Sequence, residues 1–491
     1  MRDNILVRLY RTKYQPLPLA VKAIIWFTAC NFLIKGLSFI SAPVFTRLIP
    51  EDEYGQLAIM ISYESLFLTF ATWDIHTGAY QRGYFRFKED INFFTNSTLL
   101  LINFLTVIVF TILFLFNGMV KEHTGISFIN LVIFFIYALT FPAYQMWIIR
   151  KRSEFSYKKV VAVSFSYALL GLAVSILAVM FIKPTAGVKF GSGLVCAIVF
   201  CLFFYISSIS VSSVKTRFIE AKEQWKYCLK YQGPLLLHSL SFLVLSQADR
   251  VMIGEMVGKT QTAYYSVAYN LAMAIVILQA SMEQSLQPWR FIKMEEKSYK
   301  QIGDSTNLLL LVVGVAILMF VLISPEMMRL LFTDNYYEAT WSIPPVAASV
   351  YFICLYNIFV NIETFFEKTV YVMIITVVCC LFNIILNYIC IPWFGYIACG
   401  YTTLISYVLF GVLHYIVMKY ICKKEIPGVK IFSGINILAI SVLFTLACIG
   451  ITLLYDYPII RYGLIVIISI LAYIQRRRLV PLFAALKKKR G

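Results

Sequence analysis

Long apolar stretches recur along most of this chain, and short polar segments separate them. Each stretch holds about 20 residues, enough for a helix to cross ~30 Å of hydrocarbon at 1.5 Å per residue. No small-residue cleavage site follows the first stretch, so we expect it to stay as the first span. The pattern predicts fourteen spans, at approximately 24–44, 56–73, 96–117, 126–149, 160–182, 188–209, 231–253, 261–283, 306–324, 341–363, 370–391, 397–418, 431–454 and 457–474.

Composition supports the same fold class. Of 491 residues, 60% are apolar and only 14% are charged, whereas a soluble domain carries about a quarter charged residues. Such a chain cannot cover itself with a polar surface. The sequence therefore predicts an all-α integral membrane protein.

The net charge of +18 follows a topological pattern. With the N-terminus inside, 34 of the 43 Lys and Arg fall on inner segments and six on outer loops, as the positive-inside rule requires. We therefore expect both termini in the cytoplasm, including a basic tail at residues 487–490. A nucleic-acid-binding protein would gather its charge on one face or arm, so membrane lipids are the expected partners and nucleic acid is not.

A weak internal repeat divides the predicted spans. Leu37-Ser38-Phe39 precedes Arg47 by the spacing with which Leu240-Ser241-Phe242 precedes Arg250, and Pro184 and Gly187 have counterparts at Pro392 and Gly395. The pattern predicts a six-helix unit used twice, over 1–230 and 231–420, followed by two further helices and the tail over 421–491. Transporters built from such parallel repeats bind substrate between the halves.

The longest inner connection, about 210–230, shows helical periodicity. Its apolar residues fall near one face, namely Val214, Phe218, Ala221, Trp225 and Leu229. The pattern predicts an amphipathic helix on the inner leaflet. A solvated hinge between the two halves is the alternative.

No motif for covalent chemistry appears in the sequence. Residues 254–260 resemble a phosphate-binding loop, but only three residues separate the two glycines where that loop needs four. The 11 cysteines include no C-x-x-C pair, and the four histidines are scattered, so no metal site is predicted. We expect no enzymatic activity and no cofactor.

Two charged residues fall in the middle of predicted spans. Lys35 lies eleven residues into the first span, ~16 Å deep, and Glu64 has a similar depth in the second. Ionisable groups at such depth usually face a cavity or a partner. Either Lys35 and Glu64 form an ion pair that locks two helices, or Lys35 contacts an anionic substrate group while Glu64 tunes it or binds a coupling ion.

The repeat adds further candidates. His238 holds the repeat position of Lys35, so it is either a second substrate contact or a hydrogen-bonded core residue. Arg47 and Arg250 close the first and seventh spans and are candidate substrate contacts, while Asp249 is a candidate for ion coupling or ion pairing. Membrane anchoring at the interface is the alternative for these three. Asparagines in spans more often join helices by hydrogen bonds than bind ligands.

Three groups of segments carry a family resemblance. They are Pro43-Val44-Phe45-Thr46-Arg47-Leu48-Ile49-Pro50 with Glu53-Tyr54-Gly55; Ala248-Asp249-Arg250-Val251-Met252-Ile253-Gly254 with Tyr264-Tyr265-Ser266-Val267-Ala268-Tyr269; and Asn383-Ile384-Ile385-Leu386-Asn387 with Ile391-Pro392, Gly395 and Gly400. In these segments the chain resembles the Wzx-type polysaccharide-export flippases of the multidrug/oligosaccharidyl-lipid/polysaccharide exporter superfamily. The resemblance implies export of a polyprenyl-pyrophosphate-linked oligosaccharide across a bacterial cytoplasmic membrane, for O-antigen or capsule synthesis, by alternating access between two six-helix lobes.

The resemblance also implies roles and partners. Basic residues in the cavity of such flippases are thought to meet the pyrophosphate, and Lys35 is the residue best placed for this here. Many members have twelve predicted spans, whereas lipid-flipping relatives with fourteen use the last pair to form a groove for the lipid tail. Other polysaccharide-assembly membrane proteins are the implied partners.

The driving force of transport and two alternative functions are considered last. The membrane potential, worth ~2.3 kcal/mol per charge per 100 mV, favours outward movement of an anion, and H⁺ or Na⁺ is the candidate coupling ion. A drug or organic-cation antiporter of the same superfamily would place more carboxylates than bases in its cavity. A membrane glycan polymerase or ligase would carry a large outer loop with catalytic basic residues, whereas the longest outer loop here, about 325–340, is short and acidic.

Overall fold

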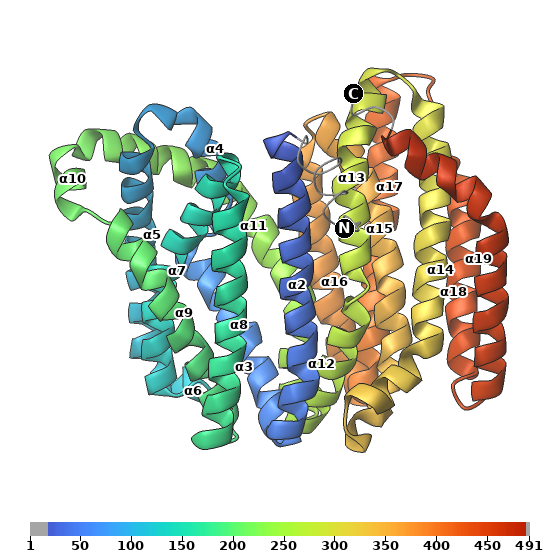
Figure 1. Cartoon of the computed structure of the whole chain (residues 1–491), viewed down its shortest axis with the longest axis horizontal. Coiled ribbons are helices and arrows are strands. Elements are labelled where there is room, and N and C mark those ends of the chain that lie inside the picture. Colours follow the sequence, from blue (N-terminus) through green and yellow to red (C-terminus); the bar gives the residue numbers. More distant parts are fainter. Residues whose placement is uncertain (1–17, 488–491) are drawn as a thin grey trace, which may run out of the picture. The chain divides into compact units, whose positions relative to one another are not determined.

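The computed structural model describes residues 18–487, and within that range the chain is helical throughout, with no strand (Figure 1). It divides into two compact units, Met1–Leu243 and Val244–Gly491. The long helix α11 (Phe218–Met256) passes from the first unit into the second.

In the part of unit 1 that the structure describes, six long helices before α11 are joined by short connections. The long helices are α2 (Leu19–Leu48), α3 (Glu51–Thr72), α5 (Ile91–Leu115), α7 (Phe128–Ser153), α8 (Tyr157–Phe181) and α9 (Ala186–Ser208), and the short ones are α4 (Gly78–Arg86), η2 (Lys88–Asp90), α6 (Asn117–Thr124) and α10 (Val211–Thr216). Helix α9 packs against α7, α8 and α3, while α2 packs against α8.

The start of α3 shows how local sequence sets these helices. Pro50 precedes it, and Glu51, Asp52 and Glu53 occupy its first turn, where negative charge offsets the helix dipole. The carboxylate of Glu53 also accepts a hydrogen bond from the backbone N–H of Ala186 at 2.7 Å. This bond satisfies one of the free N–H groups at the start of α9.

Unit 2 is built around a central helix, α15 (Ile343–Phe365). Nearly every residue of α15 up to Glu363 is buried, because α12, α13, α14, α16, α17 and α18 all pack against it. The other helices are α12 (Lys259–Met273), α13 (Val276–Glu295), α14 (Tyr299–Leu331), η3 (Asp334–Ser342), α16 (Thr369–Phe394), η4 (Gly395–Ile397), α17 (Ala398–Glu425), α18 (Gly434–Leu453) and α19 (Pro458–Lys487).

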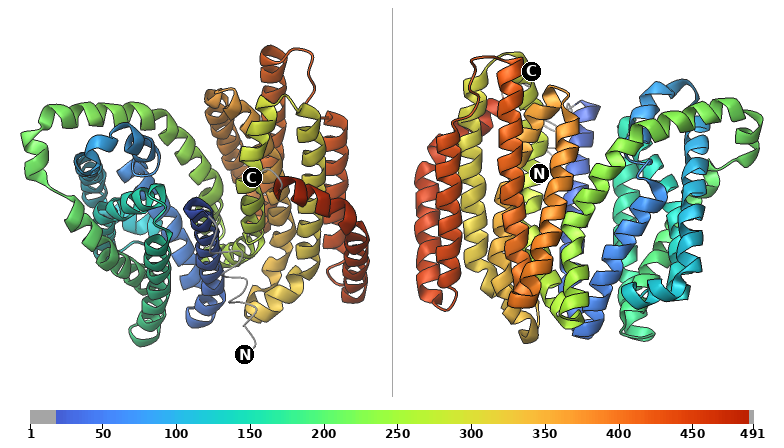
Figure 2. Two further views of the ribbon diagram at one scale, coloured as in Figure 1. Left: turned by 45° about the horizontal axis from the view of Figure 1, so that its top comes forward. Right: turned by 180° about the vertical axis from the view of Figure 1, so that it is seen from behind.

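The last two helices lie beside α14, as the views of Figure 2 and the packing both show. Helix α14 also approaches the backbone just before α18 very closely: a Cβ on Gly303 would come within 2.4 Å of the carbonyl oxygen of Ile431. Glycine is the residue that permits such an approach.

The predicted spans are confirmed as helices. Each of the fourteen falls on a long helix, with the eighth divided between α12 and α13. Within the described range, ten stretches are long and apolar enough to cross a membrane by length and composition, and three of these each contain two α-helices. The chain is thus a multi-pass all-α membrane protein, as predicted. The basic tail at residues 487–490 lies at or beyond the end of the described residues.

Most of the apolar face predicted for the linker is covered by other parts of unit 1, and the placement of the linker on the inner leaflet stays a prediction. Val214 and Ala221 are buried against Phe93 of α5. The indole N–H of Trp225 donates to the carbonyl of Ser97 at 2.8 Å. Of the predicted apolar stripe, only Phe218 is largely exposed. Periodicity predicts that a face is covered but does not say by what, and here α5 covers it.

Candidate functional site

Lys35 lies at mid-length of α2, and its side chain is exposed. At 1.5 Å per residue it is ~24 Å from one end of the helix and ~20 Å from the other. It is turned by roughly 140° from Cys30, whose thiol contacts the carbonyl of Val161 on α8. Lys35 therefore does not belong to the surface that packs α2 onto α8.

Glu64 is half-buried in α3, and the cation that acts on it is Lys189 of α9. Lys189 lies in the first turns of α9, with its Nζ 5.1 Å from the ring centroid of Phe45. Between the described residues Lys35 and Glu64 there is no ion pair. The cationic neighbour of Glu64 is thus Lys189 and not Lys35.

His238 and Arg47 occupy different settings. His238 is half-buried in α11, with its ring centroid 6.5 Å from that of Phe242. Arg47 is exposed in the last turn of α2, where a cation offsets the negative end of the helix dipole. Their roles as substrate contacts remain predictions.

Asp249 is the centre of a buried polar network in unit 2. Its side chain is only 1% exposed. Its Oδ1 accepts a hydrogen bond from Asn387 of α16 at 2.7 Å, and its Oδ2 accepts one from Thr403 of α17 at 2.8 Å. The hydroxyl of Tyr265 on α12 donates to the same Oδ2. Four helices therefore converge on one carboxylate.

Further amides and hydroxyls extend this network. Asn387 receives a hydrogen bond from the hydroxyl of Thr402 and donates to Asn383, which in turn donates to Ser406 at 3.3 Å. The segments that carry the family resemblance in the second half of the chain meet here, although they lie far apart in sequence. The network, defined by Asp249, Tyr265, Asn383, Asn387, Thr402, Thr403 and Ser406, is called the Asp249 network below.

Arg250 is also buried and turns to other partners. Its guanidinium donates to the side chain of Gln247 at 2.8 Å and lies 4.5 Å from the ring centroid of Tyr269. Membrane anchoring at the interface is therefore wrong for Asp249 and Arg250, because an anchoring charge must reach the headgroups. Asparagines do join helices here, as expected.

The Asp249 network has the chemistry of a cation or proton site. A carboxylate can bind a cation directly or take up a proton. Hydroxyl and amide oxygens can rotate to present lone pairs, and oxygen ligands are those preferred by hard cations. Within residues 18–487, no group of three or more His, Cys, Asp or Glu could hold a metal ion, so the network does not resemble a transition-metal centre.

Sequence reasoning missed several of these partners. Tyr265, Thr402 and Thr403 carry no charge, and nothing in their spacing distinguishes them from lipid-facing or core residues. Glu283 and Arg290 of α13 form a buried ion pair at 2.7 Å, and Asn361 donates to the same Glu283 oxygen. Glu283 and Arg290 could have been singled out in the sequence, because charged residues are rare in apolar helices.

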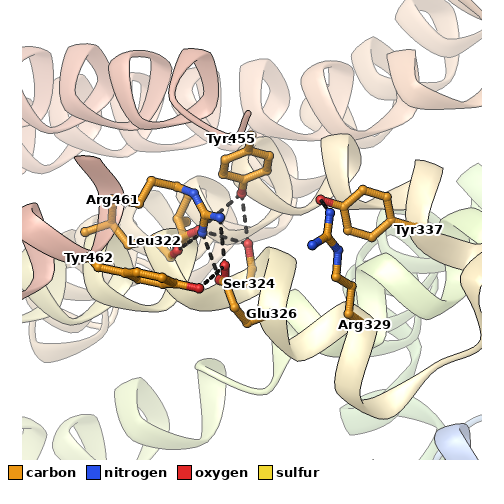
Figure 3. A network of polar contacts seen from close by, with 9 residues as sticks. Leu322, Ser324, Glu326, Arg329, Tyr337, Tyr455, Arg461 and Tyr462 are labelled. Carbon is orange, nitrogen blue, oxygen red and sulfur yellow. Dashed lines mark hydrogen bonds and ion pairs between the residues drawn. The ribbon is translucent and has the colours of Figure 1, made fainter. Parts of the chain in front are cut away.

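A second polar network ties α19 to α14 (Figure 3). Arg461 is 3% exposed, and its two Nη atoms pair with the two oxygens of Glu326 at 2.7 and 2.8 Å. It also donates to the carbonyl of Leu322 at 2.7 Å, and Tyr462 donates to Glu326 at 3.0 Å. This bidentate pair fixes the start of the last helix.

Comparison with known proteins agrees with this architecture. A family model described as "Polysaccharide biosynthesis protein" matches residues 20–294, and the MatE model matches residues 234–389. No curated protein sequence matches the chain.

Solved structures share the fold at low sequence identity. A lipid II flippase, MurJ, in an inward closed conformation has a TM-score of 0.64 and 14% identity, covering 93% of this chain and 100% of its own. An inward-facing multidrug resistance MATE family transporter of the MOP superfamily has a TM-score of 0.56 and 13% identity, covering 82% and 99%. A MATE transporter from Vibrio cholerae has a TM-score of 0.52 and 10% identity, covering 83% and 98%.

The fold of this multi-pass chain is the one that these solved flippase and transporter structures share. The chain belongs to the polysaccharide biosynthesis protein family, whose model matches more than half of it. The resemblance to polysaccharide-export flippases is thereby confirmed.

Proposed function

We propose that this protein moves a polyprenyl-pyrophosphate-linked oligosaccharide across the bacterial cytoplasmic membrane by alternating access, for the synthesis of a cell-surface polysaccharide. The match of residues 20–294 to the polysaccharide biosynthesis family carries the proposal. The shared fold with a lipid II flippase supports a lipid-linked substrate. Both termini lie in the cytoplasm in this proposal, as the positive-inside pattern indicates.

Lys35 contacts the pyrophosphate in this proposal. The substrate headgroup is anionic and must pass a region where desolvation of charge is costly. An exposed lysine at mid-length of α2 offers compensating positive charge at that depth, while the isoprenoid tail stays in lipid. Arg47, His238 and Arg250 are secondary candidates for the same anion.

The Asp249 network holds the coupling ion in this proposal, and Glu64 is the corresponding candidate in unit 1. Hydroxyl and amide oxygens around one carboxylate suit Na⁺, whereas protonation of the carboxylate would suit H⁺. No ATP-binding motif is required, because the membrane potential already favours outward movement of the anion.

Reconstitution tests the transport proposal directly. Purified protein in proteoliposomes should move a fluorescent polyprenyl-pyrophosphate oligosaccharide between leaflets, and an imposed Na⁺ or H⁺ gradient should change the rate. Protein-free liposomes are the control. Absence of movement across several glycans, together with uptake of an organic cation, would replace the proposal by drug antiport, which the MatE match over residues 234–389 makes the alternative.

The coupling site has a binding test of its own. If Na⁺ binds the Asp249 network, it should raise the thermal unfolding midpoint in detergent relative to choline at equal ionic strength, since a ligand that binds only the folded state stabilises it. Asp249→Asn should abolish that increase. Asp304→Asn, at an exposed position of α14, should leave it unchanged, and an equal Na⁺ effect in both variants would remove Asp249 from the coupling role.

A further inference from the structure

Three carboxylates of unit 2, two fully buried and one partly buried, have partners that differ in kind. Asp249 accepts from a phenol, an alcohol and an amide. Glu283 accepts from the guanidinium of Arg290 and from Asn361. These donors keep their protons at any ordinary pH, so neither of these two carboxylates has a hydrogen-bond partner that titrates.

Glu363 is the third carboxylate, and its side chain has a different kind of partner. Near the end of α15, its two oxygens lie 2.9 and 3.1 Å from Nδ1 of His414 on α17. Both side chains are completely buried. The other ring nitrogen of His414, Nε2, is buried and has no hydrogen-bond partner. The charge of this carboxylate is therefore balanced by a group that itself gains and loses a proton.

The surroundings of the pair are mostly aromatic. The ring of Tyr356 stacks on the His414 ring at 5.8 Å, and the ring of Phe410 meets it edge-on at 4.9 Å. Charged groups on the neighbouring elements are engaged elsewhere: Arg290 pairs with Glu283 on α13, and Lys368, just before α16, pairs with Glu425 at the end of α17. Tyr415, next along α17, packs on Phe359.

Electrostatics decides how many protons the pair holds. A neutral imidazole beside an ionised Glu363 would leave one uncompensated negative charge in a dry site, and two protonated groups would leave a positive one. Two protons on the pair make it neutral overall and avoid both costs, either as imidazolium with carboxylate or as imidazole with carboxylic acid. Nδ1 lies at nearly equal distances, 2.9 and 3.1 Å, from the two carboxylate oxygens, as an Nδ1–H that donates to an ionised carboxylate does, so the imidazolium form fits the geometry. In that state the second imidazole proton resides on Nε2, where no acceptor holds it.

We propose that Nε2 of His414 is a proton-binding site in unit 2, distinct from the Asp249 network. The proton binds the Nε2 lone pair and returns to water, so one N–H bond forms or breaks and Glu363 retains its charge. Because the pair is buried, exchange requires an opening that admits water between α15 and α17. Coupling of this proton to glycan movement rests on the proposed function, but the binding of the proton does not.

The protonation state of His414 is measurable without any transport assay. The full-length protein, labelled with ¹⁵N-histidine, is placed in lipid nanodiscs at neutral pH and observed by solid-state NMR. The signals of His414 are those lost in His414→Gln. We expect both ring nitrogens of His414 to carry protons in the parent protein. In Glu363→Gln we expect one of them to have lost its proton, because the compensating charge is gone.

Controls separate proton binding from folding and from transport. His123→Gln, at an exposed position, should remove one set of signals and leave those of His414 unchanged. The double variant Glu363→Gln/His414→Gln keeps two hydrogen-bonding amides without a titratable group, and it should elute as the parent does in gel filtration. A neutral His414 in the parent protein, or the same doubly protonated ring in Glu363→Gln, would overturn the proposal.

A transport readout addresses the coupling. In proteoliposomes that flip the glycan, the double variant should respond at least about twofold less to an imposed pH gradient than the parent protein. An unchanged response would show that the proton is not coupled. If the parent protein flips no glycan, the proposed function fails, while the NMR result on His414 still stands.

Discussion

At the scale of single residues, Lys35 is the side chain on which the substrate hypothesis depends. It is exposed at mid-length of α2, so truncation removes charge without opening a cavity. Lys35→Ala should abolish glycan export while membrane levels of the protein stay the same. Lys35→Arg, which keeps the charge, should retain part of the activity. Surface polysaccharide and immunoblotting of membranes measure the two quantities.

A distant lysine controls for net charge in this experiment. Lys300 is exposed in the first turn of α14, and Lys300→Ala should export normally. Export at the parental rate by Lys35→Ala would remove Lys35 from the substrate path, whatever the other basic residues do.

Sequence reasoning succeeded unevenly at this scale. Asp249 and Asn387 were each identified as candidates for some polar role, but the hydrogen bond between them joins positions 138 residues apart. Such proximity follows from helix packing, which a single sequence does not encode locally. Lys189 fell inside the predicted span 188–209 and lies in α9, which begins at Ala186, but its proximity to Glu64 of α3 likewise follows from helix packing.

At the scale of elements, the packing of the linker onto α5 leads to a stability prediction. Trp225 is half-buried and donates to the carbonyl of Ser97, so Trp225→Ala removes a large apolar contact and a hydrogen bond. We expect a loss of about 2 kcal/mol, below the range for a fully buried tryptophan. Thermal unfolding of the purified protein in detergent measures it.

Phe218 provides the matched control for the linker. Its side chain is 53% exposed and its ring meets that of Trp225 edge-on at 5.9 Å, so Phe218→Ala should lower stability by less than about 1 kcal/mol, clearly less than Trp225→Ala. Equal effects of the two substitutions would mean that the linker does not rest on α5. Periodicity correctly predicted an apolar stripe at these positions. Only the structure shows that α5 is the helix that packs against it.

The attachment of α19 to α14 gives a second prediction for an element. Arg461→Met removes both bonds to Glu326 and the bond to the Leu322 carbonyl. Breaking a buried pair costs about 3–5 kcal/mol. Because Glu326 is 34% exposed, we expect a smaller loss of roughly 1–2 kcal/mol. Unfolding midpoints in detergent check this.

Arg329 lies on the same helix as Glu326 and serves as the control (Figure 3). It is exposed, and its hydrogen bond to Tyr337 is 3.1 Å long. Arg329→Met should have little effect on the unfolding midpoint, because exposed polar contacts contribute little. If both substitutions had the same small effect, the last two helices would owe their position to apolar packing alone.

At the scale of the whole molecule, apolar length was sufficient to predict the spans. A stretch of about 20 apolar residues can cross hydrocarbon only as a helix, because its backbone polar groups must bond to one another there. Each predicted span is indeed helical. The buried polar networks were beyond this reasoning, because Tyr265, Thr403 and His414 differ from ordinary membrane residues only through their neighbours. Apolar length does not give the direction in which each span crosses. The unequal distribution of Lys and Arg between inner and outer loops predicts that direction.

Membrane topology is therefore the prediction that belongs to the whole chain, and cysteine labelling tests it. Ten of the eleven native cysteines are buried and Cys390 is intermediate, so the parent protein should react weakly with an impermeant maleimide. In spheroplasts, Lys183→Cys, at an exposed turn between α8 and α9, should be labelled from outside. Lys222→Cys, on the exposed side of the linker, should react only after the membrane is opened. The reverse pattern would place both termini outside and would overturn the topology that the positive-inside rule predicts.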